Sequence, residues 1–380
     1  MKTLRWLAGI ALFLVAALGT LYLSPAQARP KQNERISVFA PRLPKLGQLV
    51  LHGSANAGLM RALILDYQRL HPGVEVRYSH LDTQALYDRV LRPGNAAERA
   101  DLVLSASTDL QAKLVNDGYA RAHRSPNGQA LPAAARWRDE LFAYGYEPVT
   151  MVYHSGRLDP AQAPRDRDGL LRLLRRADQP LCGRIAVQDP RDSAVAYFIA
   201  TQDAKLLGQG AAPLLAALGA QRAQPYKRMD ALLDRLAEGE LSLAYGVFGS
   251  YALQRIERGA PLRVVLPRDH LLLVARTALI PREAPHADEA RRFLDHLLSP
   301  RGQALLAREA YLIPARADLP APPAYRGLLG AAANPRRVPL GLGLLVYLDE
   351  TKRRNFLHDW TASILRIESP QPGFHADARR

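Results

Sequence analysis

The sequence predicts an α/β protein of two lobes that are joined by two crossing strands. Strand-like and helix-like patterns alternate in two separate sets along the chain, which is typical of parallel sheets covered by helices. Two long, extended, apolar stretches at 141–153 and 271–280 would carry the chain from one lobe to the other and back. In addition, the roughly 350 residues beyond the N-terminal segment exceed what one hydrophobic core usually supports.

The N-terminus has the features of an export signal. Lys2 and Arg5 precede an uncharged apolar run at 6–23, and small residues follow at Ala26 and Ala28. This pattern predicts a signal peptide at 1–28, cleaved after Ala28, and a periplasmic protein. An uncleaved anchor is the alternative, because about 18 apolar residues reach the lower limit for spanning a bilayer.

A first lobe is predicted at 47–145 together with 276–345, after a proline-rich and basic leader at 29–46. Its strands are expected at 49–51, 74–78 and 102–104, and apolar residues at helical spacing follow each of them. The helices are expected to end at the turn residues 71–73, near residue 91, and at 116–118.

A second lobe is predicted at 146–275. We expect strands at 185–187, 241–244 and 262–266, and helices at 193–201 and 229–237. The C-terminal region should then supply an amphipathic helix at 287–298, ending at Ser299 and Pro300. A last helix at about 349–365, within a C-terminal region at 346–366, should pack on a lobe, and the tail at 367–380 should be disordered.

Composition excludes several classes of function. Cys182 is the sole cysteine, so neither an internal disulfide nor a zinc site of cysteines is expected, and we predict no cofactor and no metal site. The net charge of +15 is spread over the chain, and no basic tract is interleaved with aromatic residues as single-strand binders require. We therefore expect a monomer that binds no nucleic acid.

Four blocks of the sequence resemble one family. Residues 281–303 read PREAPHADEARRFLDHLLSPRGQ, and three shorter blocks read ADLVLS at 100–105, QDPRDS at 188–193 and AYGVFGSY at 244–251. In order and spacing they are similar to the iron and organic-anion branch of the periplasmic solute-binding proteins of ATP-driven importers. The resemblance implies the type 2 periplasmic binding fold, with a ligand held between two lobes and then delivered to an inner-membrane permease.

The ligand is predicted to be a small anionic solute, either a phosphate ester or a carboxylate. Iron-binding members of that family carry adjacent tyrosines near the loop that here spans Tyr245 to Ser250, and this chain has no such pair. Tyrosinate oxygens are hard donors suited to a hard cation, so their absence argues against ferric iron. Binding of a ferric complex stays open as an alternative. The protein would equally fit a ligand-sensing role in which it reports to a membrane sensor kinase.

Candidate ligand-binding residues lie where predicted strands end or predicted helices begin. Ligands of open α/β sheets gather beyond the carboxyl ends of the strands, and helix N-termini attract anions. Serine and asparagine at helix starts are also ordinary caps, and their recurrence in both lobes is what favours a ligand site. The candidates are Ser54, Asn56, Ser105, Ser107, Arg191, Ser193, Tyr245 and Ser250, with Tyr197 and Tyr226 as weaker ones.

No catalytic residues are predicted. His52, Asp101 and Asp109 lie near candidate serines, but the sequence around Ser54 lacks the Gly-x-Ser-x-Gly spacing of a nucleophile elbow. No histidine pair has the spacing of a zinc peptidase. The sequence therefore favours a binding protein over a hydrolase.

Overall fold

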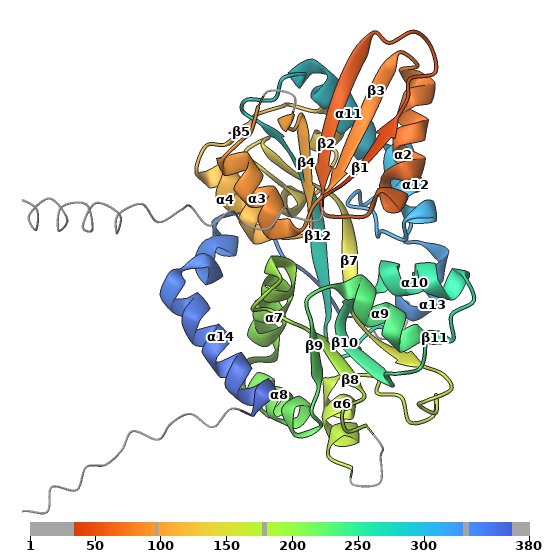
Figure 1. The fold of residues 1–380 in the computed structure, drawn as a ribbon, viewed down its shortest axis with the longest axis vertical. Helices are drawn as coiled ribbons and strands as arrows, with labels where there is room; N and C mark the ends of the chain where they lie inside the picture. Colours follow the sequence, from red (N-terminus) through yellow and green to blue (C-terminus); the bar gives the residue numbers. More distant parts are fainter. Residues whose placement is uncertain (1–33, 96–97, 177–180, 330–333, 367–380) are drawn as a thin grey trace, which may run out of the picture. The chain divides into compact units, whose positions relative to one another are not determined.

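The computed structural model describes residues 34–95, 98–176, 181–329 and 334–366. The predicted signal peptide at 1–28 and the predicted disordered tail at 367–380 lie outside this part of the chain. Figure 1 shows the fold as a ribbon. None of the helices in the described ranges combines the length and the apolar character that a membrane crossing requires.

Two long strands, β7 (Leu141–His154) and β12 (Leu271–Pro281), cross between the lobes as the sequence predicted. They pair antiparallel, with a bulge between Arg276 and Thr277. Every residue of β12 is buried, and so is every residue of β7 except His154. Strands buried on both faces read as continuous apolar runs, which is why these two were visible in the sequence.

Lobe 1 is built on the sheet order β1-β3-β2-β4-β12-β7. Its other elements are β1 (Arg35–Phe39), β2 (Gly47–Gly53), α2 (Ala57–Leu70), β3 (Val74–His80), α3 (Thr83–Leu91), β4 (Leu102–Ser105), α4 (Thr108–Asn116), β5 (Ala120–Arg121), α5 (Pro126–Gln129), η2 (Ala133–Ala135) and β6 (Arg136–Trp137). β2 is parallel to both β3 and β4, so the carboxyl ends of β2 and β4 share one edge of the sheet.

Lobe 2 continues the sheet in the order β7-β10-β8-β9. Its elements are α6 (Arg167–Leu174), β8 (Ile185–Gln188), α7 (Ala194–Leu207), η3 (Gly208–Gly210), α8 (Ala211–Ala220), β9 (Gln224–Tyr226), α9 (Met229–Ala237), β10 (Leu243–Phe248), α10 (Gly249–Glu257) and β11 (Leu262–Val265). β8 is parallel to β9 and β10, and a separate apolar cluster that includes Ile185 and Leu243 forms part of the lobe's core. The two lobes with two crossing strands are the type 2 fold that the sequence predicted.

The C-terminal region packs on both lobes. It comprises α11 (Ala287–Leu298), α12 (Pro300–Glu309), α13 (Pro323–Leu329), β13 (Pro335–Arg337), η4 (Leu342–Leu348) and α14 (Glu350–Leu365). Ser299 ends α11 and caps α12, because its Oγ accepts a hydrogen bond from the backbone N–H of Gly302 at 3.0 Å. Trp360 and Ile364 of α14 join the apolar cluster of lobe 2, which confirms that the last helix packs on a lobe.

Two local predictions were wrong. The predicted leader contains β1, an edge strand that pairs only with β3 and leaves Ile36 and Val38 more than half exposed, so its apolar pattern was weak. The segment from Tyr245 to Ser250 is not a loop, because β10 continues to Phe248 and α10 begins directly after it. The strand passes Gly246 through a bulge at a φ of +76°.

Candidate ligand-binding site

The predicted residues of lobe 1 lie together at the edge where β2 and β4 end. The backbone N–H of Ala106 donates to Ser54 Oγ at 3.2 Å, which joins the two loops. Asn56 is exposed and caps α2 by accepting from the N–H of Leu59 at 3.1 Å. Tyr78 supports the same loop by donating its hydroxyl to the carbonyl of Ala55 at 2.7 Å.

Ser105 and Ser107 are buried, and their hydroxyls are used within lobe 1. Ser105 Oγ accepts from the N–H of Ser107 at 3.2 Å, and Ser107 Oγ donates to Asp109 Oδ1 at 2.8 Å. Burial raises the pKa of Asp109 to about 6, although the hydrogen bond from Ser107 opposes that rise. The two serines thus order the start of α4, where the Asp109 carboxylate also accepts hydrogen bonds from the backbone N–H groups of Asp109 and Leu110.

Arg191 and Ser193 lie at the start of α7 in lobe 2. Ser193 caps the helix, since its Oγ accepts from the N–H of Ala196 at 3.3 Å. Arg191 binds Asp189 with two hydrogen bonds, Nε to Oδ1 at 2.9 Å and Nη2 to Oδ2 at 2.6 Å. Burial alone would raise the pKa of Asp189, but Arg191 lowers it below its usual value. With 35% of its side chain exposed, Arg191 retains donors for a further partner.

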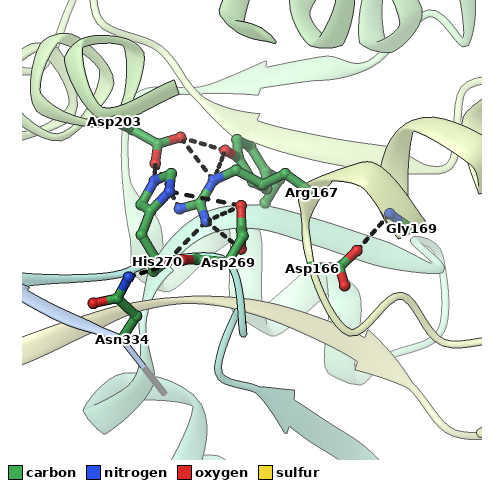
Figure 2. Close-up of polar contacts among 8 residues, drawn as sticks. Asp166, Arg167, Gly169, Asp203, Asp269, His270 and Asn334 are labelled. Carbon is green, nitrogen blue, oxygen red and sulfur yellow. Dashed lines mark hydrogen bonds and ion pairs between the residues drawn. The ribbon is translucent and has the colours of Figure 1, made fainter. Parts of the chain in front are cut away.

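Tyr245 belongs to a buried polar network inside lobe 2. Its hydroxyl donates to Asp203 and accepts from Arg167 Nε at 2.9 Å. Arg167 also donates to Asp203 Oδ1 at 2.5 Å and to Asp269 Oδ1 at 3.0 Å, and His270 Nε2 lies 3.1 Å from Asp203 (Figure 2). The hydroxyl predicted to meet a ligand is therefore directed toward α6 and α7 rather than toward lobe 1.

The electrostatics of this network favour an ionised Asp203. Burial alone would raise the pKa of Asp203, but hydrogen bonds from His270, Tyr245 and Arg167, together with the charge of Arg167, lower it. Asp269 and His270 immediately precede β12, so the network holds the segment that leads into the start of this crossing strand. These partners lie 36 to 103 positions from Arg167 along the chain, so no local pattern predicts them.

Ser250 lies in a second polar cluster, at the point where the strands cross. Its hydroxyl donates to Glu147 Oε1 at 2.8 Å, and Arg276 Nε donates to the same oxygen at 2.7 Å. Among the described residues, neither Glu147 Oε2 nor the hydroxyl of Tyr144 has a hydrogen-bond partner. Glu147 and Arg276 are not among the predicted site residues, although each is a single charge within an extended apolar run.

The predicted residues therefore form separate groups. Ser54, Ser105 and Ser107 lie on one edge of lobe 1, and Arg191 and Ser193 lie at one helix start of lobe 2. Helices α3 and α7 contact each other where the lobes meet. Tyr245 and Ser250 belong to the two buried clusters instead.

Within the part of the chain that the structure describes, two cavities each lie within a single lobe. One lies in lobe 2 between α7, α8 and α14, with Asp203 and Tyr245 in its lining. The other, of about 370 Å³, lies in lobe 1 beside Arg89, Arg99 and Arg282. Within the described ranges, no group of three or more histidine, cysteine, aspartate and glutamate side chains is placed to hold a metal ion.

Comparison with known families gives one match. The model of the bacterial extracellular solute-binding protein family matches residues 49–312, which is more than half of the chain. No curated protein is significantly similar to the chain in sequence.

Solved structures share the fold over most of the chain. The substrate-binding protein of an ABC transporter from Agrobacterium tumefaciens is 29% identical, with a TM-score of 0.80 over 88% of this chain and 99% of its own. The periplasmic binding protein AfuA from Actinobacillus pleuropneumoniae, bound to fructose-6-phosphate, is 20% identical with a TM-score of 0.67 over 84% and 99%. Iron-bound HitA from Pseudomonas aeruginosa is 18% identical with a TM-score of 0.64 over 83% and 99%.

Proposed function

The chain belongs to the bacterial extracellular solute-binding proteins, and from this premise we propose that it captures a small anionic solute in the periplasm, either a phosphate ester or a carboxylate. The solute is held between the two lobes and delivered to an ABC-type importer of the inner membrane. No bond is made or broken, since this is a family of substrate-binding proteins rather than enzymes.

One observation carries the anionic character of the solute. Three helices drawn from both lobes, α2, α4 and α7, begin beyond the carboxyl ends of β2, β4 and β8. Each helix start carries the positive end of a helix dipole, and those of α2 and α7 also present backbone N–H groups, which favours an anion. At α4 the Asp109 carboxylate takes the N–H groups of Asp109 and Leu110. Arg191 adds a part-exposed guanidinium at the start of α7, and guanidinium groups bind phosphate and carboxylate in a fork geometry. The net charge of +15 would steer anions toward the protein.

The architecture supports closure of the lobes about the crossing strands. Among the described strands, β7 and β12 join the lobe 1 and lobe 2 parts of the sheet, and the bulge at Arg276 and Thr277 interrupts their ladder near its middle. A ligand that contacts both lobes makes all its contacts only in the closed state, so binding favours closure. The proposed contacts are Ser54 and Asn56 in lobe 1, with Arg191 and Ser193 in lobe 2.

The test is a thermal-shift screen of the mature protein against sugar phosphates, di- and tricarboxylates and ferric complexes. A solute present at 100 times its Kd stabilises the folded state by about 2.7 kcal/mol, which raises the Tm by several degrees. Native mass spectrometry of protein taken from the periplasm should reveal the natural solute. A shift with a ferric complex and with no simple anion would overturn the proposal.

A pair of variants localises the effect. Arg191→Gln should reduce the shift by removing the guanidinium, whereas Arg263→Gln, an exposed change on β11, should preserve it. Equal shifts in the two variants would place the anion elsewhere.

A further inference from the structure

The C-terminal segment from Leu340 to Leu365 has one end on each lobe. Its first part lies on lobe 1, where the N–H of Leu340 donates to the carbonyl of Ala134 at 2.9 Å. Next, η4 packs on α4, and Leu344 is 2% exposed. The segment lies beyond residue 312, where the family match ends.

The second part of the segment, α14, lies on lobe 2. Trp360 and Ile364 are buried in the apolar cluster of that lobe. The backbones of α14 and α8 approach closely at Gly219, since a Cβ on this glycine would lie 1.9 Å from the carbonyl oxygen of Ser363. Only glycine permits this approach without displacement of the helix.

Between its two ends, the segment contacts the start of α7. Tyr197 donates its hydroxyl to the carbonyl of Tyr347 at 2.6 Å, and the guanidinium of Arg353 lies 4.5 Å from the centre of the Tyr197 ring. Trp360 lies under the guanidinium of Arg191 at 5.7 Å. In Figure 1, α14 runs from the lobe 1 end down to α8, with α7 between it and the crossing strands.

We propose that residues 340–365 are a strap that limits how far the two lobes open. This inference rests on the hinged closure proposed above. Rotation about β7 and β12 alone leaves both strands intact, but a third connection displaced from them must stretch or detach when the lobes separate. Restricting the open state raises the population that is ready to bind, and thus increases the apparent affinity.

The strap is tested by measuring the distance between the lobes in the full chain. Spin labels are placed on the native exposed Cys182 of lobe 2 and on Asn116→Cys at the exposed end of α4, and pulsed EPR reports the distance distribution without ligand. In Gly219→Ala, the added methyl group displaces α14 from α8, so the distribution should extend to longer distances. Gly210→Ala is the matched control at the other end of α8, where the nearest atom lies 3.8 Å from the added Cβ.

A second variant covers the case in which Gly219→Ala does not fold. Arg353→Gln removes the contact with the Tyr197 ring and the attraction of the guanidinium for Asp109 of lobe 1, and should also lengthen the distances. Lys352→Gln, at its exposed neighbour, should not. If the folded strap variants keep the wild-type distribution, the strap is refuted. A wild-type distance that no solute shortens would instead contradict hinged closure, so the two failures are distinguishable.

Discussion

The guanidinium of Arg276 and the carboxylate of Glu147 form an ion pair between the two crossing strands, with Nη2 2.6 Å from Oε1. Their side chains are only 2% and 0% exposed. Ser250 of lobe 2 donates to the same carboxylate oxygen, and the guanidinium lies 5.6 Å from the ring centre of Phe248. The charges of both strands are thus neutralised at the point where the lobes join.

Removing one partner of this ion pair should cost more stability than replacing both partners. Arg276→Met or Glu147→Gln leaves one buried partner without its counterpart, so each should lower the free energy of unfolding by about 3–5 kcal/mol. In urea unfolding, the double variant should lose much less unfolding free energy than the sum of the two single losses. The exposed pair of Arg235 and Glu240 provides a control, and Glu240→Gln should leave stability nearly unchanged. Strictly additive losses would contradict a coupled pair.

Tyr245→Phe should reduce stability without reducing solute affinity. The change deletes the hydrogen bond to the buried carboxylate of Asp203 and the one accepted from Arg167 Nε, for which we expect a loss of about 2 kcal/mol in urea unfolding. Tyr226→Phe should lose less, because the Tyr226 hydroxyl donates to a neutral amide oxygen, that of Gln224, at 3.0 Å. If Tyr245→Phe keeps the wild-type stability but solute shifts its Tm less, Tyr245 contributes to the ligand site.

Gly302→Ala should destabilise the protein through a backbone collision. A Cβ at this position would lie 2.1 Å from the carbonyl oxygen of His296, in the turn that joins α11 to α12. Relieving that contact requires the turn to shift, at a cost of about 2 kcal/mol or more in unfolding free energy. Gly47→Ala is the matched control, because its nearest neighbour would lie 3.7 Å away. An unchanged Tm in Gly302→Ala would mean that the turn adjusts freely.

Much of the fold was predictable because the hydrophobic pattern reports burial. β7 and β12 are buried on both faces and read as uninterrupted apolar runs, and the apolar positions of α11 recur at helical spacing. By contrast, β1 buries only Phe39 deeply, and an edge strand with exposed Ile36 and Val38 leaves little pattern to detect. Register and bulges are tertiary properties, so the continuation of β10 past the bulge at Gly246 has no local signal in the sequence.

The candidate site was predictable only at its helix starts. Capping makes Asn56 and Ser193 recognisable, because a short polar side chain before an apolar helix has a local role. The network of Arg167 with Asp203 and Asp269 joins residues far apart in the chain, and nothing local distinguishes a buried arginine from an exposed one. The position of the Tyr245 hydroxyl depends on that network, so the residues next to Tyr245 in the sequence do not predict it.

Asp109→Asn should change the pH dependence of stability. Burial raises the pKa of Asp109 in the folded protein to about 6, above 3.8 for the ordinary carboxyl, so the folded state holds its proton more strongly than the unfolded state. The stabilisation from the protonated form is complete below pH 3.8 and is lost as the pH rises through 6. Relative to the Asn variant, the wild type should therefore lose at most about 2–3 kcal/mol of unfolding free energy between pH 4 and pH 7.

Urea unfolding of both proteins across this range measures the difference directly, so the titration of other groups cancels. Ser107→Ala supplies the comparison, because Ser107 Oγ donates to Asp109 Oδ1 and its loss removes an interaction that favours the carboxylate. In that variant the same transition should occur at higher pH. In the contrary outcome, the unfolding free energy of the wild type minus that of Asp109→Asn is constant from pH 4 to pH 7. That result would show that Asp109 keeps one protonation state throughout, so that the start of α4 carries a fixed charge.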